Sequence, residues 1–294
     1  MKTARRFLAV VFATLVIVGL AQAQVNFYVI EKAQVYVQTS SATPSAHPTV
    51  PFLFSAQIEG TAIGSIPQHA FTLPGIPGSP INIPPTSDPA TRKQYQQNFT
   101  DKGVMDTAFP NGAYLFDVDT VLDVSLTLAG TGNVDLYPSV IPKVIGMTNG
   151  AFWNGSGQLM IDPTLGTTLT LSTFTEYNSL LGGQVGAHIG AFFYSTSGPF
   201  TQINQEAFTF NSDPSFNTFV IGALTPGDTY QFEMEFNVAT TFNNTSLGGA
   251  KGVALFTDRM IFDAVAIPEP STYAAIFGAL ALAGVMIVRR RRTA

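Results

Sequence analysis

The chain has 294 residues, contains no cysteine, and carries a formal net charge of −5. Without cysteine it forms no disulfides, has no thiolate metal ligands and cannot use cysteine catalysis. The acidic balance argues against nucleic-acid binding, which requires a basic face.

The first 23 residues are typical of a secretory signal peptide. Lys2, Arg5 and Arg6 form a basic start, 7–20 is an apolar core, and Ala-Gln-Ala at 21–23 is a small-residue cleavage site. We therefore expect export through the general secretory route, with cleavage by signal peptidase after residue 23.

The region that follows, 24–266, is predicted to be all-β, because no long stretch shows helical spacing of apolar residues. Alternating apolar and polar residues predict strands at 26–37 and 50–60. Seven prolines fall within 66–90, which predicts a long irregular loop because proline cannot occupy a central strand.

One short helix is predicted directly after this loop. Asp88 and Pro89 resemble an N-cap and a first helical position. Tyr95 and Phe99 are four residues apart, as on one face of a helix. Together these signals predict a helix over 89–101.

The longest alternation of apolar and polar residues covers 113–128 and predicts one strand with a buried and a wet face. Asp117 and Asp119 share the wet face, about 7 Å apart along the strand. Carboxylates at that spacing are candidate ligands for calcium, which prefers oxygen. The alternative is a solvated surface. No other cofactor is expected.

The only tryptophan, Trp153, stands beside Asn154. An exposed indole ring can stack on a sugar ring, so Trp153 is the candidate sugar-binding residue. The alternative is that the only tryptophan of a sandwich packs in its core.

Many short strands separated by turns predict an antiparallel β-sandwich, either one large or two small with a division near residue 150. Glu233 and Glu235 share the outer face of one predicted strand. As a glycosidase pair they would need a cleft between opposing elements, which the sequence does not show. The further strands are predicted at 142–148, 157–161, 167–177, 185–195, 206–211, 217–221, 229–238 and 252–264.

A turn motif precedes the strand at 229–238. It reads Leu224, Pro226, Gly227 and Tyr230 in the pattern Leu-x-Pro-Gly-x-x-Tyr. This pattern is similar to the tyrosine corner of fibronectin type III and Ig-like sandwiches. The resemblance implies that the tyrosine hydroxyl bonds to backbone at the corner.

The C-terminal stretch 267–294 has three parts. Pro268, Glu269 and Pro270 come first, and an uncharged apolar run then extends from residue 273 to residue 288. Such a run spans about 24 Å as a helix, close to the ~30 Å of a bilayer core. We therefore predict a transmembrane helix over 272–288. The chain then ends in a membrane-flanking block, Arg289, Arg290, Arg291 and Arg292, expected on the cytoplasmic side.

This order of motif, helix and arginine block resembles the PEP-CTERM sorting signal of Gram-negative bacteria. The resemblance covers about the last thirty residues. It implies recognition by exosortase, processing near Pro-Glu-Pro, and release from an initial membrane anchor to the cell surface or medium. Many such proteins come from species that make exopolysaccharide, which makes exopolysaccharide the candidate partner.

Seven of the 14 basic residues and 18 of the 19 acidic residues lie between the two terminal segments, so the exported body carries about −11. We expect a non-enzymatic structural or binding component of the envelope or exopolysaccharide matrix. The alternatives are a carbohydrate-binding or carbohydrate-active protein and an adhesin.

Overall fold

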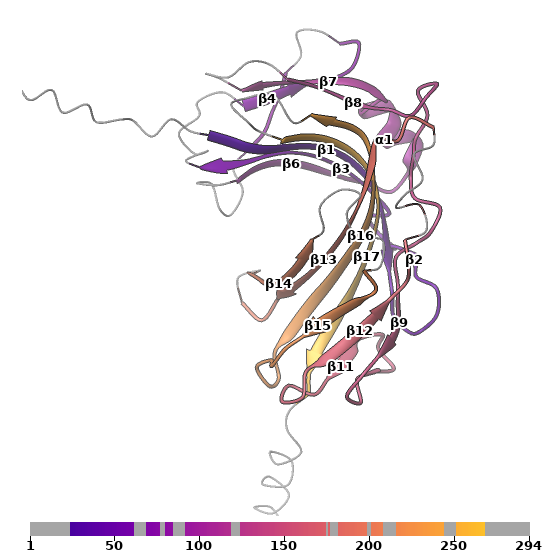
Figure 1. Cartoon of the computed structure of the whole chain (residues 1–294), viewed down its shortest axis with the longest axis vertical. Helices are drawn as coiled ribbons and strands as arrows, with labels where there is room; N and C mark the ends of the chain where they lie inside the picture. Colours follow the sequence, from indigo (N-terminus) through magenta and orange to yellow (C-terminus); the bar gives the residue numbers. More distant parts are fainter. Residues whose placement is uncertain are drawn as a thin grey trace, which may run out of the picture.

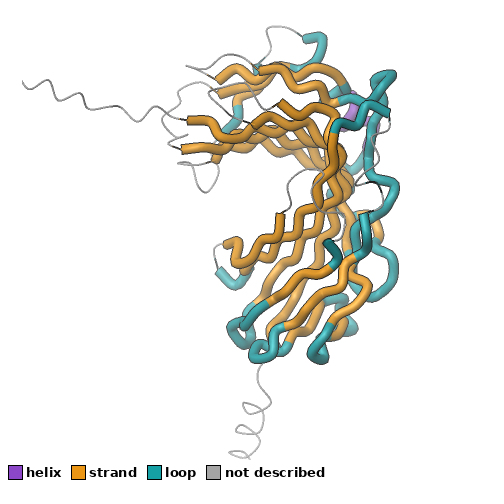
Figure 2. Tube along the Cα trace, in the orientation of Figure 1, coloured by secondary structure: helices purple, strands orange, loops and turns teal. Residues whose placement is uncertain are grey.

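The computed structural model is mostly β and bent into a C, and the residues that it describes include one short helix (Figures 1 and 2). The predicted signal peptide and the tail from Pro268 onward lie outside the residues that it describes. Within the described part of the chain, no helix has the length and apolar character needed to cross a bilayer. The described residues are 24–61, 69–76, 80–84, 92–118, 124–174, 176, 182–198, 201–207, 216–243 and 251–267.

One large sheet runs through the whole C. Its strand order is β14-β13-β16-β17-β1-β3-β6, and three short strands lie off this path: β2 pairs with β1, β11 with β17, and β10 with β11. The strands are β1 Gln24–Val37, β2 Ser45–Ala46, β3 Phe52–Thr61, β6 Arg92–Phe99, β10 Phe152–Trp153, β11 Leu159–Ile161, β13 Gly186–Ser195, β14 Thr201–Ala207, β16 Thr229–Asn243 and β17 Lys251–Ala266.

Two smaller sheets cover the convex face of the large one, one on each half (Figure 1). The first has the order β5-β4-β7-β8 and the second β15-β12-β9. The helix α1, Lys102–Ala108, begins at the N-cap Asp101, whose carboxylate accepts from the Val104 amide at 2.9 Å. The strands are β4 His69–Thr72, β5 Ile81–Asn82, β7 Gly112–Val118, β8 Val124–Leu128, β9 Val144–Met147, β12 Thr167–Leu171 and β15 Thr218–Ile221.

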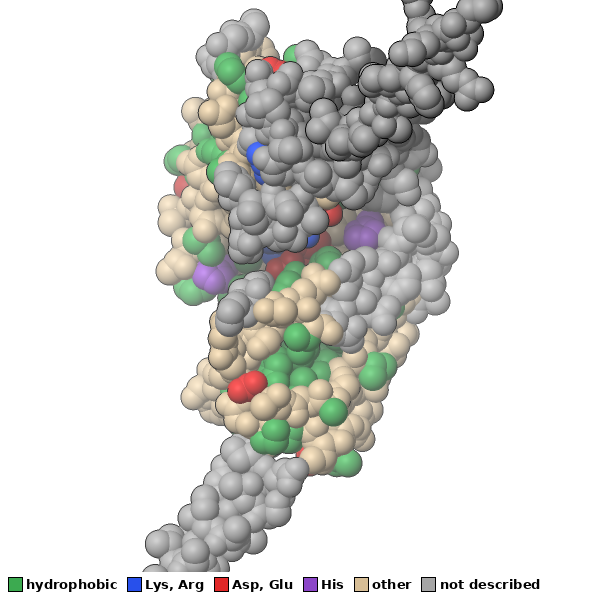
Figure 3. All heavy atoms as spheres, turned by 90° about the vertical axis from the view of Figure 1, so that its left-hand side faces the viewer, with side chains coloured by type: hydrophobic (Ala, Val, Ile, Leu, Met, Phe, Trp, Pro, Cys, Tyr) green, Lys and Arg blue, Asp and Glu red, His purple; other side chains and the backbone are tan. Residues whose placement is uncertain are grey.

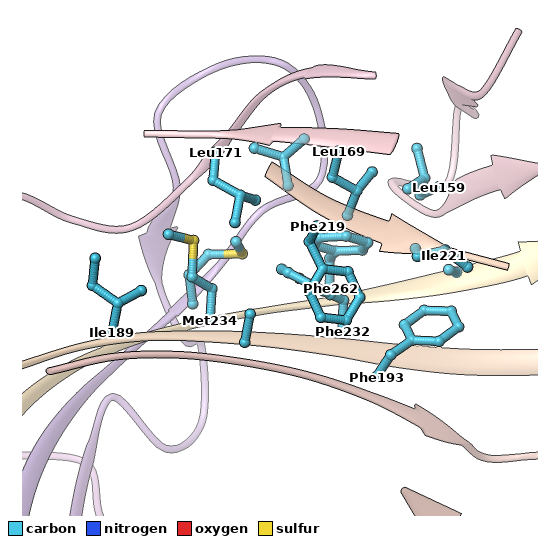
Figure 4. Close-up of a cluster of buried hydrophobic side chains, with 14 of the residues drawn as sticks. Leu159, Leu169, Leu171, Ile189, Phe193, Phe219, Ile221, Phe232, Met234 and Phe262 are labelled. Carbon is cyan, nitrogen blue, oxygen red and sulfur yellow. The ribbon is translucent and has the colours of Figure 1, made fainter. Parts of the chain in front are cut away.

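Each half has its own hydrophobic core. In the first core, Phe54 stacks on Phe109 with ring centroids 3.8 Å apart. In the second, Phe232 packs against Phe219 of the facing sheet and against Phe262 on the neighbouring strand of its own sheet (Figure 4). Strand β17 supplies Phe256 to the first core and Phe262 to the second. The two cores therefore share one sheet, and no single cut near residue 150 separates them.

A buried lysine ties α1 to the large sheet. Lys32 on β1 is fully buried, and its ammonium donates to Asp106 at 2.7 Å and to Asn111 at 2.8 Å. Asp106 also accepts from Lys102 at 2.6 Å. A buried charge is tolerated only when it is paired in this way.

The tyrosine corner expected at Tyr230 is confirmed. The Thr225 amide donates to the Tyr230 hydroxyl at 3.0 Å. In the other half, the Tyr114 hydroxyl donates to the Pro110 carbonyl at 2.7 Å. Each half therefore has a buried tyrosine whose hydroxyl forms a hydrogen bond with the backbone of a preceding turn.

The prediction of one long strand over 113–128 is wrong. The segment holds β7 and β8, which pair as a hairpin with Phe116 opposite Val124 and Tyr114 opposite Leu126. In each pair the two residue numbers are both even or both odd, as in Phe116 with Val124. The alternation of apolar and polar residues therefore keeps the same phase in both strands. Alternation alone cannot tell a long strand from such a hairpin.

The predicted helix over 89–101 is also wrong, because β6 occupies 92–99. Tyr95 and Phe99 do share a face, but a spacing of four residues fits both a strand and a helix. The helix begins later, at Lys102. The proline-rich segment 66–90, expected to be irregular, contains β4 and β5.

The prediction of purely antiparallel sheets is wrong. Strands β1 and β17 pair in parallel, and so do β11 and β17. A parallel pair needs a long connection, and here the chain between β1 and β17 builds both cores. The strand predicted at 206–211 overlaps β14 only at 206–207, and 208–211 lie outside the described residues. The other predicted strands correspond to observed ones, although β12 ends earlier than expected.

Candidate functional site

The concave face of the large sheet forms a cleft of about 510 Å³. Figure 3 looks into it and shows acidic and basic side chains gathered deep in the hollow between the two halves of the C. The described lining comprises carboxyls (Glu31, Glu59, Glu233, Glu235), guanidiniums (Arg92, Arg259), amides (Gln57, Gln94, Gln96, Gln202, Asn237), aromatic rings (Phe27, Phe192, Tyr194), Val29, Ser55, His188 and Leu255.

Strand alternation explains why polar residues gather here. On β16, Phe232, Met234 and Phe236 point into the second core. Glu233 and Glu235 therefore point to the opposite, concave face. Strands β1, β3, β6, β13 and β17 alternate in the same way, so one polar surface forms across all six strands.

The floor of the cleft is an ion cluster centred on Arg259. Its Nη2 lies 2.7 Å from Glu235 and 3.2 Å from Glu31, and its Nε lies 3.6 Å from Glu233. Arg259 sits directly opposite Glu235 in the pairing of β16 with β17. The four side chains are only 10–20% exposed, so the surrounding water screens their charges weakly.

The carboxyls of this cluster differ in protonation. Burial raises the pKa of Glu233 to about 8, and the opposing attraction of Arg259 does not outweigh it. Burial likewise raises the pKa of Glu31. At Glu235, burial is outweighed by Arg259 and by hydrogen bonds from Glu233 and Asn237, so its pKa is lowered. Near neutral pH, Glu233 is therefore a neutral acid that donates to an ionised Glu235.

Amide side chains on the neighbouring strands are held in place by hydrogen bonds. Gln57 donates to Glu59 at 2.6 Å, and Gln94 donates to the Ser55 hydroxyl at 3.1 Å. Glu59 also pairs with Arg92 at 2.6 Å. The arrangement fixes the directions in which these amides can contact a ligand.

The side of the cleft formed by β13 adds aromatic rings and a histidine. Phe192 and Tyr194 stack with ring centroids 6.2 Å apart. Asn237 lies 3.3 Å from His188 Nδ1 and accepts from the Thr257 hydroxyl at 2.6 Å. Burial lowers the pKa of His188, so its ring is uncharged at neutral pH.

Two neighbouring carboxyls are also what a glycosidase uses, but the geometry of Glu233 and Glu235 does not fit that chemistry. A retaining or inverting pair flanks the scissile bond with carboxyl groups about 5–10 Å apart. Glu233 and Glu235 instead share a hydrogen bond, and Arg259 lies against both. This arrangement favours binding over hydrolysis.

Of the residues singled out from sequence, Glu233 and Glu235 line this cleft, whereas Trp153 and Asp117 are not among its described lining residues. Trp153 is partly buried, its ring packs edge-to-face on Phe262 at 5.1 Å, and its Nε1 is buried. This placement gives the sugar-platform hypothesis no support. Asp117 lies on β7, but Asp119 is outside the described residues.

The calcium hypothesis therefore stays a prediction. Among the residues that the structure describes, no group of three histidine or acidic side chains has a metal-binding arrangement. The sorting motif Pro268, Glu269 and Pro270 and the block Arg289–Arg292 also lie outside the described residues.

Comparisons with known proteins leave the family open. No protein-family model and no curated protein matches the chain. Among solved structures, a cytokine receptor complex aligns at 8% identity over 74% of this chain and 94% of that chain, with a TM-score of 0.21. The FN1-FN3 domains of chicken CNTN1 align at 9% identity over 81% of this chain and 65% of that chain, with a TM-score of 0.23. With TM-scores this low, neither likeness bears on function.

Proposed function

We propose that this chain is an exported glycan-binding protein of the bacterial envelope, with its ligand in the concave cleft. The composition of the cleft carries the proposal: five amide side chains, paired charges and a stacked aromatic pair share one concave sheet face. Amides can donate to and accept from sugar hydroxyls, and aromatic faces pack on sugar rings. The volume of about 510 Å³ is that of an ordinary ligand site.

Preorganisation supports a binding role. Gln57, Gln94 and Asn237 are each held by a hydrogen bond to a neighbouring side chain. Side chains already fixed in one arrangement lose little entropy when a ligand binds. A rigid polar sheet face of this kind suits an extended, hydroxyl-rich polymer.

Replacing Gln96 with alanine should weaken glycan binding about five- to ten-fold, the effect of losing one or two ligand hydrogen bonds. The matched control is Gln97→Ala, on the same strand. Both side chains are exposed, but only Gln96 lines the cleft. A glycan array would find the ligand, and titration calorimetry would compare the variants. Equal losses in both variants, or a loss only in Trp153→Ala, would contradict the proposed site.

The delivery of the protein is a further part of the proposal. The signal peptide and the PEP-CTERM-like tail support export, a membrane anchor through 272–288, and processing by exosortase. Exopolysaccharide is then the candidate partner at the cell surface. In this proposal, the cleft is the surface through which the envelope or matrix component binds that polymer.

Intact mass spectrometry of the exported protein tests this delivery. The proposal expects a mature species that begins at Gln24 and lacks residues 272–294. A species that retains 272–294 and stays in the membrane fraction would contradict processing, while leaving the cleft proposal standing.

A further inference from the structure

Both guanidiniums described in the cleft are already neutralised by carboxyls of the protein. Arg259 contacts three carboxyls at 2.7, 3.2 and 3.6 Å. Arg92 pairs with Glu59 at 2.6 Å. An anionic ligand would have to displace one of these carboxyls to reach a cation.

The described lining also contains an excess of acids, with four carboxyls against two guanidiniums. His188 adds no positive charge, because burial keeps its ring neutral. The exported body as a whole carries about −11, with 18 acidic and seven basic residues between the terminal segments. Glu233 keeps its proton near pH 7, so the described lining holds no cation in excess of its carboxylates, while the negative charge of the whole body repels anions and attracts cations.

We propose that the cleft selects glycans that carry protonated amino groups over neutral glycans and excludes glycans that carry carboxylates or sulfates. This selectivity rests on the proposed function and names its ligand class. The ammonium group would lie at the cluster of Glu31, Glu233 and Glu235, where the acids outnumber the one guanidinium. Glycan hydroxyls would contact the amides on β3 and β6.

Proton release is the signature of this arrangement. Glu233 is a neutral acid near pH 7 because burial raises its pKa to about 8. A ligand ammonium placed beside it would favour the carboxylate, so Glu233 would lose its proton to the buffer as the ligand binds. The groups that face Glu233 are Arg259 on β17, Glu235 on β16, Glu31 on β1, and Tyr194 and His188 on β13, with Glu59 and Arg92 across the cleft.

The test is titration calorimetry with the full chain in mild detergent at about pH 5.5, where the amino groups of a glucosamine oligomer are already protonated in solution and Glu233 is still a neutral acid. Three oligosaccharides of equal length are compared: glucosamine, N-acetylglucosamine and galacturonate oligomers. Each titration is repeated in two buffers of different ionisation enthalpy, which reports proton release. We expect the glucosamine oligomer to bind about ten-fold tighter than the acetylated one, with proton release, and the galacturonate oligomer not to bind.

The variant Glu233→Gln should abolish proton release and reduce the preference for the glucosamine oligomer. Asp263→Asn is the matched control, because Asp263 is an exposed acid on β17 that does not line the cleft. Equal binding of the two glucosamine-based oligomers, or binding of galacturonate, would overturn the selectivity and leave the proposed function standing. Binding of none of the three, with no other glycan bound on an array, would overturn the proposed function itself.

Discussion

Replacing Arg259 with methionine should lower the free energy of unfolding by about 3–5 kcal/mol at pH 7, the usual effect of breaking a buried ion cluster. Glu31 and Glu235 would lose the cation that lies 3.2 and 2.7 Å away. Urea denaturation of the variant and the wild-type protein measures the difference.

The loss should be smaller at pH 5 than at pH 7. Without Arg259, the folded-state pKa of Glu235 loses the attraction that holds it low, and the pKa of Glu31, which burial already raises, rises further. A raised carboxyl pKa leaves stability intact below the unfolded value and removes it as pH rises toward the folded value. Lowering the pH from 7 to 5 should therefore recover part of the free energy of unfolding that Arg259→Met loses.

Glu233→Gln provides the control for Arg259→Met. Since Glu233 is already a neutral acid at pH 7, its amide replacement should cost no more than about 1 kcal/mol, the value of one hydrogen bond. The description of the cluster would be contradicted if Arg259→Met had the same free energy of unfolding as the wild-type protein at pH 7. It would also be contradicted if both variants lost the same amount.

Replacing Asp258 with asparagine should stabilise the protein in mildly alkaline solution. Asp258 lies on β17 between the two cores, is 2% exposed, and its Oδ1 has no hydrogen-bond partner among the described residues. Burial, with a smaller contribution from Glu176, raises the pKa of Asp258 to about 8. In the unfolded chain the same carboxyl ionises near pH 4.

The folded protein therefore keeps a proton on Asp258 that the unfolded chain releases. The free energy of unfolding falls for this reason as pH rises from about 4 to about 8. The asparagine variant has no such cost and should be more stable than the wild-type protein by roughly 3–5 kcal/mol at pH 8, with little difference at pH 4. Thermal and urea unfolding across this pH range measure the effect. The control Asp263→Asn should show no such trend, and a trend of equal size there would contradict the assignment to Asp258.

Much of the fold could be predicted from local patterns. The alternation on β16 and β17 and the corner at Tyr230 each depend on a few neighbouring residues, and the structure confirms them. The failures have a common cause. The spacing of Tyr95 and Phe99 fits two kinds of element, and the alternation over 113–128 fits a strand or a hairpin, so only tertiary pairing decides between them.

The candidate site could not be predicted in the same way. The sequence shows Glu233 and Glu235 on one strand face, but it does not show what lies opposite. Glu31 and Arg259 are 228 positions apart and meet only because β1 and β17 pair in parallel. The strand face that alternation marks as wet is in fact the floor of a cleft, because the large sheet bends toward it (Figure 1).

The most direct test of the central claim is hydroxyl-radical footprinting of the protein with and without its oligosaccharide ligand. If the glycan lies in the concave cleft, oxidation of Phe192 and Tyr194 should fall on binding, because both rings line the cleft. Oxidation of Phe152, which is 50% exposed and lies outside the described lining, should not change. Protection of Phe152 and its neighbour Trp153, with Phe192 and Tyr194 unchanged, would contradict the claim.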